Sequence, residues 1–236
     1  MASPHRLFLV LLLLAGGLLS GCARFIQYNQ LADGYYHVRA ATPAALRGQL
    51  APDRVYVQQH HDTLDFTPAP VSDAVPPTYR YRLQPAETVY LSRKSFDLDV
   101  FSIPFKVLPP RRGLPVQLNT NFNVALYAGR RFDFYRATAR RTTPFGPTPV
   151  VRGNGFGYGI FGGLGSSLIT PDVTQQRSLT GYEGFTLHGG VAAIYDARVF
   201  NLGLALGADH LLGFEGRYWI FQNRPWLGVL FGVDLN

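Results

Sequence analysis

Cysteine and lysine are nearly missing from this chain of 236 residues. The one cysteine, Cys22, cannot form a disulfide within the chain, and a single thiolate does not make a cysteine metal site. Lysine occurs only as Lys94 and Lys106, so arginine supplies almost all of the positive charge behind the net charge of +7. The composition therefore excludes a disulfide-stapled fold and is compatible with anionic partners, because guanidinium groups bind phosphate oxygens in a bidentate manner.

Only one long apolar run is present, from Leu7 to Leu19. It follows a short basic start and ends in small residues, which is the anatomy of a secretory signal and not of a spanning helix. The run closes with Leu19-Ser20-Gly21-Cys22, which resembles the lipobox of bacterial lipoprotein signals. That resemblance implies cleavage before Cys22, a diacylglycerol thioether on its sulfur and an acyl chain on the new amino terminus. Several acyl chains anchor a protein to a membrane effectively permanently.

If the chain is exported from the cytoplasm, the anionic partners available to its positive charge are different. A pI near 9.7 fits nucleic acid in a cytosolic protein, but an exported chain meets anionic lipid headgroups instead. The other interpretation is that the arginine excess only reflects the base composition of the genome. The residue after Cys22 is Ala23 and not the aspartate that keeps a lipoprotein from reaching the outer membrane. By resemblance to lipoprotein sorting signals, this implies delivery to the outer membrane, with the amino-terminal segment in the periplasm. We expect outer-membrane lipids as partners, other envelope proteins as a further option, and no nucleic acid.

The chain divides into four segments by composition. We expect a cleaved signal peptide over 1–21, a lipidated tether over 22–52, a short amino-terminal β segment with a proline-rich linker over 53–94, and a β-barrel domain over 95–236. Within the third segment, two strand-like stretches flank His60-His61-Asp62 and predict a hairpin with a polar turn. The prolines of residues 67–78 predict the linker.

From Ser95 onward, every second residue is large and apolar while its neighbours are glycine, alanine or polar. This is the period of a β-strand. Glycine costs about 0.5 to 1 kcal/mol at a strand position, so a soluble sandwich has little reason to carry so many glycines. A small membrane barrel accounts for both features, because its outer face meets lipid and its narrow interior needs small or paired polar side chains.

The alternation assigns side chains to the two faces of this expected barrel. Its lipid-facing residues include Leu202, Leu204, Leu206, Leu227, Val229, Phe231 and Val233. Its polar interior residues include Asp97, Asp99, Asn121, Asn123, Asp209 and Asp234. Interior carboxylates need cationic partners, which we expect to be Arg130, Arg131 or Lys106. Aromatic residues near strand ends are expected at the membrane interfaces, among them Tyr195, Trp219, Phe221 and Trp226.

Six long strands are predicted, over 95–107, 117–136, 153–169, 183–196, 199–212 and 225–236. Single-chain outer-membrane barrels have about eight strands or more. Either an amino-terminal hairpin therefore completes the wall or the strand count is wrong. The fold we expect is all-β, a small antiparallel up-and-down membrane-type barrel of about eight strands. The loops over 170–182 and 213–224 are expected outside the cell, and the 137–152 connection in the periplasm.

The carboxy-terminal half also carries a resemblance. The stretches that carry it are residues 95–100, 117–123 and 223–228, together with 234–236 at the end of the chain. They resemble uncharacterised small β-barrel proteins of bacterial outer membranes. The resemblance implies a barrel in that membrane and supplies no catalytic residue or ligand.

Three patterns invite a chemical interpretation. His60-His61-Asp62 offers metal-ligand side chains, but adjacent side chains on a strand diverge and no third ligand is placed by spacing, so a solvated turn is favoured. Gly157–Gly162 satisfies a dinucleotide fingerprint, yet the glycine alternation of a strand continues through it. Asp209 beside His210 is a candidate acid–base pair, but no serine has a nucleophile setting. We predict no catalytic, cofactor or metal site, and no enzyme.

Two functions remain. The first is an outer-membrane lipoprotein with a membrane-inserted small β-barrel and a structural or envelope role without catalysis. The second is a periplasmic, lipid-anchored soluble β-barrel or sandwich that binds an apolar small ligand. The two functions place Leu204 and Phe231 oppositely, against lipid in the first and around a cavity in the second.

Overall fold

The computed structural model of the protein describes residues 31–232 except 41, 51–53, 61–62, 71–74, 86, 144–145 and 197–200. The expected signal peptide over 1–21 lies outside the described residues, as do Cys22, His61, Asp62, Val233 and Asp234. The structure is all-β, with an antiparallel sheet of 11 strands. The chain divides into two units. Unit 1 holds the described residues up to Arg93 together with Phe134–Gly153, and unit 2 holds Lys94–Asp133 and the described residues from Asn154 onward.

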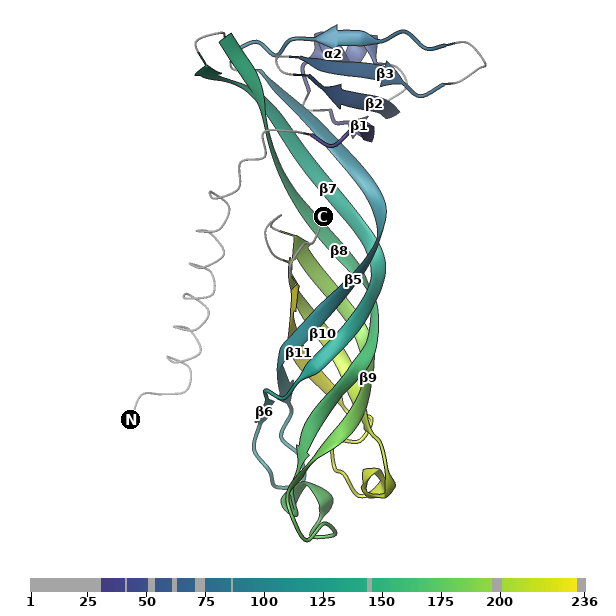
Figure 1. Ribbon diagram of the computed structural model, residues 1–236, viewed down its shortest axis with the longest axis vertical. Helices are drawn as coiled ribbons and strands as arrows, with labels where there is room; N and C mark the ends of the chain where they lie inside the picture. The colour runs from purple at the N-terminus through teal and green to yellow at the C-terminus, as the bar shows by residue number, and fades with distance from the viewer. Residues whose placement is uncertain are drawn as a thin grey trace. The chain divides into compact units, whose positions relative to one another are not determined.

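Unit 1 is a small sheet with one short helix, drawn mostly in purple and blue in Figure 1. Its own elements are β1 (Gly34–Val38), α2 (Ala44–Gln49), β2 (Arg54–Gln59), β3 (Leu64–Pro68) and β4 (Tyr79–Tyr81). Parts of β5 (Thr88–Leu108), β7 (Asn123–Thr143) and β8 (Gly146–Ile169) also belong to it. The strand order is β5-β1-β2-β3-β4. Alternate residues of β1 and β2 face one core, in which Tyr36, Val55 and Val57 are fully buried, because strand side chains alternate between faces.

Three expectations for this part of the chain can be compared with the structure. The hairpin is confirmed, since β2 pairs with β3 and His60 donates its backbone N–H to Thr63. The tether over 22–52 is wrong for residues 34–38 and 44–49, which form β1 and α2. The strand signal of β1 was missed because its period covers only five residues. The 137–152 connection is largely strand, because β7 continues to Thr143 and β8 begins at Gly146.

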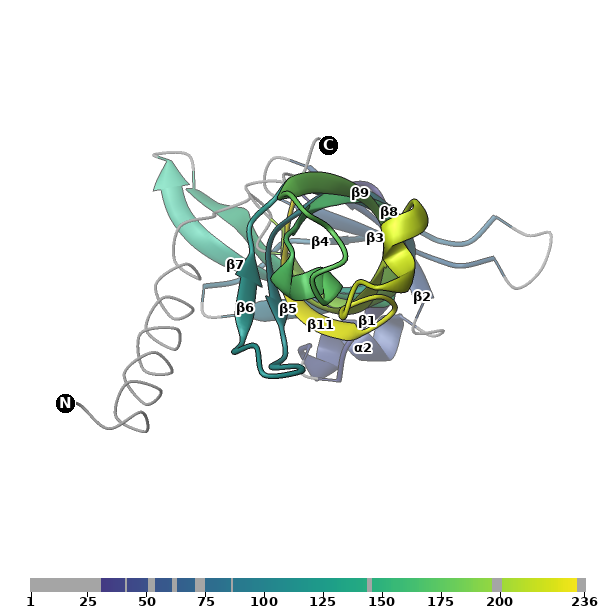
Figure 2. The same cartoon turned by 90° about the horizontal axis from the view of Figure 1, so that it is seen from below.

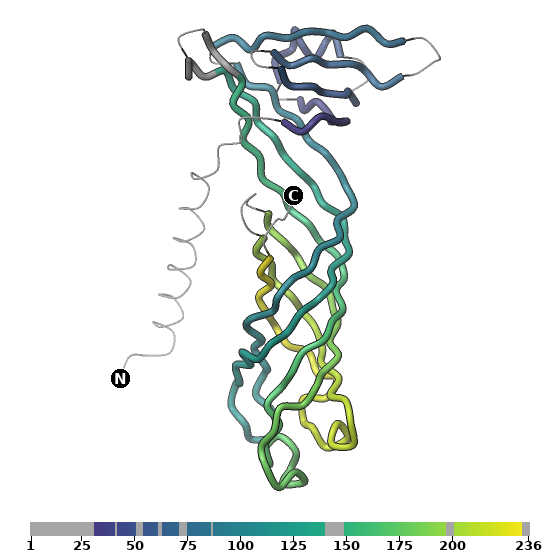
Figure 3. Tube along the Cα trace, viewed as in Figure 1, coloured from purple at the N-terminus to yellow at the C-terminus, as the bar shows by residue number. Residues whose placement is uncertain are grey.

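Unit 2 is built around a closed ring of strand pairings. Besides its parts of β5, β7 and β8, it contains β6 (Gln117–Asn119), η1 (Asp172–Thr174), β9 (Tyr182–Asp196), β10 (Asn201–Leu211), η2 (Phe214–Arg217) and β11 (Pro225–Gly232). The strands follow the order β5-β7-β8-β9-β10-β11, and β11 pairs back onto β5, with Leu227 opposite Val107. We call these six strands of unit 2 the ring. Figure 2 shows the ring along its axis, and Figure 3 shows its strands winding around one another.

The ring closes with six strands, so the expectation of about eight does not describe it. The six are the long strands predicted from the alternation, and β1 to β4 belong to unit 1. Pairing partners far apart in sequence decide how a sheet closes, and the alternation within each strand carries no information about them. Among the described residues, no helix has both the length and the apolar character that crossing a membrane requires.

The two faces of the ring differ in how much space they leave beside each backbone. Gly163 and Gly190 face inward, and a Cβ atom added there would meet the backbone of the neighbouring strand, 2.7 Å from Ala125 Cα and 2.6 Å from Gly207 Cα respectively. Gly162 faces outward and has no atom closer than 3.9 Å to an added Cβ. The inward glycines therefore permit a wall this tightly curved, which is the physical basis of the sequence alternation.

Large aromatic side chains fill the interior between these glycines. Phe101 packs edge-on against Tyr127 with ring centroids 5.7 Å apart, and Phe161 lies 5.9 Å from Trp226. The expectation that Trp226 sits at a membrane interface is wrong, because its side chain is buried inside the ring. Trp219 and Phe221 are buried as well, whereas Tyr195 is exposed.

Candidate functional site

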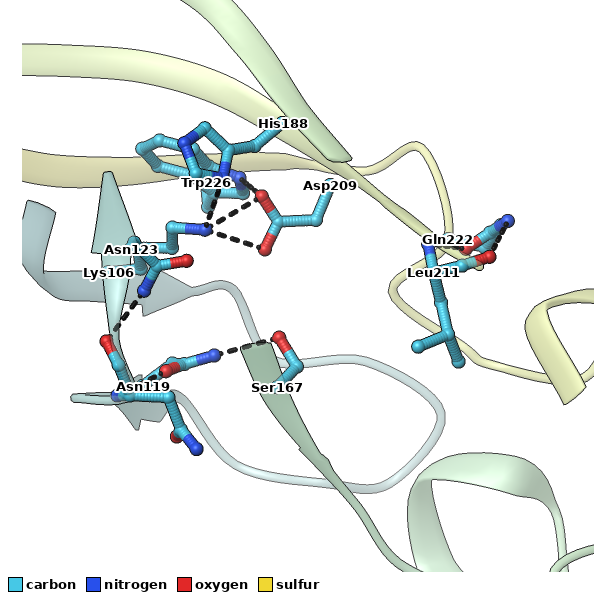
Figure 4. Close-up of polar contacts among 10 residues, drawn as sticks. Lys106, Asn119, Asn123, Ser167, His188, Asp209, Leu211, Gln222 and Trp226 are labelled. Carbon is cyan, nitrogen blue, oxygen red and sulfur yellow. Dashed lines mark hydrogen bonds and ion pairs between the residues drawn. The ribbon is translucent and has the colours of Figure 1, made fainter. Parts of the chain in front are cut away.

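A buried lysine lies at the centre of one polar cluster inside the ring. Lys106 on β5 is fully buried, and its Nζ lies 3.0 Å from each carboxylate oxygen of Asp209 on β10 (Figure 4). The same Nζ lies 3.5 Å from Nδ1 of His188 on β9 and 4.8 Å from the ring centroid of Trp226 on β11. The indole Nε1 of Trp226 donates a hydrogen bond of 2.6 Å to Asp209 Oδ1. Four strands thus contribute one side chain each to this lysine cluster (Lys106, His188, Asp209 and Trp226).

Strand register and glycine placement build the lysine cluster. Lys106 is opposite Gly228, and Asp209 is opposite His188. A Cβ atom at Gly228 would lie 2.8 Å from the Trp226 ring, so the missing side chain makes room for the indole beside the lysine stem. A buried charge is tolerated only when it is paired, and removing one partner of such a pair costs about 3 to 5 kcal/mol. The cluster therefore disfavours any register of β5 against β11 that separates the two charges.

A chain of amide and hydroxyl groups lies near the lysine cluster. Asn119 on β6 donates from Nδ2 to Ser167 Oγ on β8 at 2.9 Å. Its Oδ1 accepts the backbone N–H of Asn121 at 2.8 Å, and Asn123 Nδ2 donates to the carbonyl of Asn121 at 2.7 Å (Figure 4). These bonds fix the segment that leads from β6 into β7, so their arrangement is that of a structural polar network.

A second charged cluster surrounds Arg131 on β7. Its Nε lies 3.0 Å from Asp133 Oδ1, its Nη2 bonds Asp196 on β9, and its Nη1 is 4.0 Å from Asp97 on β5. Asp133 and Asp196 are almost completely buried, and Arg131 is only slightly exposed. One guanidinium thus bonds carboxylates from two other strands and its own, and it ties β5, β7 and β9 together inside the ring.

The structure brings together most of the polar residues expected in the interior. Asp209 and Asn123 are buried, whereas Asp97, Asp99 and Asn121 are half-buried. Lys106 and Arg131 face inward beside carboxylates, as expected. Arg130, the third expected cation, is instead exposed on the outward face of β7, because it neighbours the inward Arg131. Asp234 lies outside the described residues.

Several interior residues escaped the sequence analysis. They are His188, Asp133, Asp196, Asn119 and Ser167. Each occupies the same alternate position as small or buried neighbours on its strand, so the period that located Asp209 could have located these as well. Trp226 was expected in the wrong environment, because the strand period does not reveal which partner stands opposite.

The outward face of the ring is apolar. Of the residues expected to face lipid, Leu204, Leu206, Leu227 and Phe231 are exposed, Leu202 and Val229 are half-buried, and Val233 lies outside the described residues. Leu204 is 70% exposed. Other strands of the ring present the same kind of side chain, including Phe96, Leu98, Leu126, Ile160, Leu164 and Phe185.

The histidine and glycine patterns singled out in the sequence can be located among the described residues. No three His, Cys, Asp or Glu side chains among them lie close enough to hold a metal ion. In unit 1, His60 Nε2 lies 3.3 Å from Asp65 Oδ2, and the Asp65 carboxylate also accepts hydrogen bonds from Arg80. The glycines of 157–162 lie in the middle of β8, so they do not form the strand-to-helix turn that a dinucleotide needs.

Comparison with known proteins identifies no relative. The sequence matches no model of a protein family, and searches of curated proteins and of solved structures give no match. The functional inference therefore depends on the chain's own residues.

Proposed function

We propose that this chain is an outer-membrane lipoprotein, anchored through an acylated Cys22, whose ring crosses the membrane as a small β-barrel. Its role is structural, within the cell envelope, and involves no catalysis. The observation that carries the proposal is the inverted polarity of the ring: charged and amide side chains lie inside, and large apolar side chains are exposed outside.

The exposed apolar side chains are spread over all six strands of the ring, which favours lipid over water as their surroundings. One example from each strand is given by Phe96, Leu126, Ile160, Phe185, Leu204 and Leu227. Soluble monomers rarely expose contiguous apolar patches larger than a few hundred Å², whereas a lipid-facing barrel wall needs such a band on all sides.

The length of the band fits a bilayer. On β9 the outward residues from Phe185 to Tyr195 carry no charge, and this stretch matches the roughly 9 to 11 residues that a tilted strand needs to cross a membrane. At one end of the band, Lys94 Nζ lies 5.7 Å from the ring centroid of Phe132, which stacks on Tyr158 at 5.9 Å. Aromatic and cationic side chains of this kind are typical of membrane interfaces.

The alternative function, an apolar ligand enclosed by a soluble β-barrel or sandwich, receives less support. It requires an apolar cavity inside the ring, but Phe101, Tyr127, Phe161 and Trp226 are packed there with the lysine cluster. The exposed leucines would also have to line that cavity, and they face away from it. We therefore keep only the first function.

Membrane washing tests the proposal without relying on the anchor. Outer membranes from cells that express a Cys22→Ala variant with a cleavable signal would be washed with carbonate and urea. The proposal expects the unlipidated protein to stay in the membrane and to migrate differently on a gel before and after heating. Release of a folded, soluble protein would refute it.

A pair of arginine substitutions provides the matched control. Leu204→Arg places a charge within the apolar band and should destabilise the inserted protein by up to about 2 to 4 kcal/mol, the cost of such a charge at the bilayer midplane. Leu179→Arg places the same charge in a loop at a residue that is 92% exposed, and should change stability little. Both sites are exposed, so a protein in water would tolerate the two changes equally; equal effects on insertion would contradict the proposal.

A further inference from the structure

A groove of about 680 Å³ lies on the ring and is formed by two parallel rows of side chains. Strand register places Tyr158, Ala193 and Leu204 side by side in the first row, and Ile160 beside Val191 in the second. Ala193 has the smallest side chain of the first row, so this side of the groove is shallowest between Tyr158 and Leu204. The volume lies within the range of about 300 to 1,000 Å³ that is usual for small-molecule sites.

The groove lies on the outer face. The side chains of Tyr158, Ile160 and Leu204 are more than half exposed. The floor between the two rows is formed by small inward-facing residues such as Gly159 and Ala205, whose backbone is all that separates the groove from the interior. None of the large aromatic side chains described inside the ring belongs to the lining.

A single cation stands at one end of this apolar groove. The lining runs across the wall from β7 to β11, and Arg130 on β7 is the only charged residue among the described residues that form it. Arg130 is exposed, and its carbonyl lies beside Gly157 of the neighbouring β8. No ion pair or hydrogen bond is assigned to its guanidinium among the described residues, unlike that of the adjacent Arg131.

We propose that the groove binds one anionic phospholipid, with an acyl chain between the two rows and the phosphate on the Arg130 guanidinium. The apolar lining supplies a surface for methylene groups, which gain free energy when they leave water or fill a gap in the wall. The guanidinium supplies N–H groups that donate paired hydrogen bonds to phosphate oxygens. The proposal rests on the membrane-spanning ring proposed above, and it adds a specific lipid site to it.

Lipid binding to the full chain in zwitterionic detergent tests this site. Phosphatidylglycerol and phosphatidylcholine with identical acyl chains would be titrated and the bound lipid counted by native mass spectrometry. The expected result is one tightly held phosphatidylglycerol, bound roughly tenfold more tightly than phosphatidylcholine, because both lipids offer a phosphate to Arg130 but the choline cation of phosphatidylcholine offsets the attraction. Equal binding of the two lipids would refute the proposed preference of the groove for an anionic lipid.

Two variants with matched controls separate the parts of the site. Ala193→Trp fills the groove and should abolish the bound lipid of either kind, whereas Leu187→Trp, outward but outside the lining, should not. Arg130→Gln should remove only the preference for phosphatidylglycerol, and Lys94→Gln, an exposed cation outside the lining, should keep it. Undiminished binding by Ala193→Trp would overturn the proposal.

Two further outcomes are distinguishable. If phosphatidylglycerol binds only after Cys22→Ala, the protein's own acyl chain occupies the groove and the phospholipid proposal fails. Carbonate washing of the Ala193→Trp variant in the Cys22→Ala background reports separately on membrane insertion, which should remain as in Cys22→Ala alone. Loss of lipid with retention in the membrane supports the site, whereas release of Cys22→Ala alone would refute the proposed function whatever its lipid content.

Discussion

Two adjacent glycines on β8 should respond oppositely to the same substitution. Gly162 faces outward, and a Cβ atom there has nothing closer than 3.9 Å. Gly163 faces inward, and a Cβ atom there would meet the carbonyl of Val124 and lie 2.7 Å from both Ala125 Cα and His188 Nε2. The carbonyl and Cα belong to the backbone of β7, which is held in the ring by its pairings and cannot shift as a side-chain tip can.

The magnitudes follow from these surroundings. Gly162→Ala should stabilise the protein by about 0.5 to 1 kcal/mol, since alanine loses less backbone entropy on folding. Gly163→Ala gains the same entropy but overpacks the wall, which typically costs about 1 to 3 kcal/mol. The urea-unfolding free energy of the two full-length variants, measured in the same detergent, should therefore differ in sign or by at least about 1 kcal/mol. Equal effects would refute the claim that inward glycines are required by the curvature of the ring.

Two further predictions concern single polar side chains. Lys106→Met should lower the free energy of unfolding by about 3 to 5 kcal/mol because it leaves Asp209 buried without its cation, and adding Asp209→Leu should restore most of the loss; a double variant as unstable as the single one would contradict a paired-charge role. Burial, with the hydrogen bond donated to Glu87, raises the pKa of Tyr81 to about 12. The folded state therefore favours the neutral phenol. The contribution of this phenol to the free energy of unfolding is complete below pH about 10 and falls as pH rises toward 12. The difference in tyrosinate absorbance between the wild type and Tyr81→Phe should titrate near 12, and a midpoint near 10 would contradict the burial.

The two faces of the ring were predictable because a strand alternates strictly. Leu204 and Asp209 lie on opposite faces of β10, and a one-residue shift in register would exchange every such assignment. The long strands were found for the same reason. Their polarity could be derived from local sequence alone, since no knowledge of the pairing partner is needed to separate one face from the other.

Closure and interior contacts depend on partners that are distant in sequence. Lys106 and Asp209 are separated by 103 positions, and the pairing of β11 with β5 closes the ring so that their side chains meet inside it. Trp226 was misplaced at an interface because nothing near it in sequence indicates the carboxylate that its indole N–H reaches. The short strand β1 was missed for a different reason: its period covers only five residues, and Tyr36 and Val38 are buried by other parts of unit 1.

Lipid contact at the outward face can be measured directly, because Cys22→Ala leaves a chain without cysteine. Single cysteines at Leu204 and at Leu179 would carry a fluorophore in vesicles that contain phospholipids with brominated acyl chains. If the ring crosses the membrane, the label at Leu204→Cys is quenched by the brominated chains and protected from aqueous iodide, whereas the label at Leu179→Cys behaves in the opposite way. Iodide quenching of equal strength at the two positions would contradict a membrane-spanning ring.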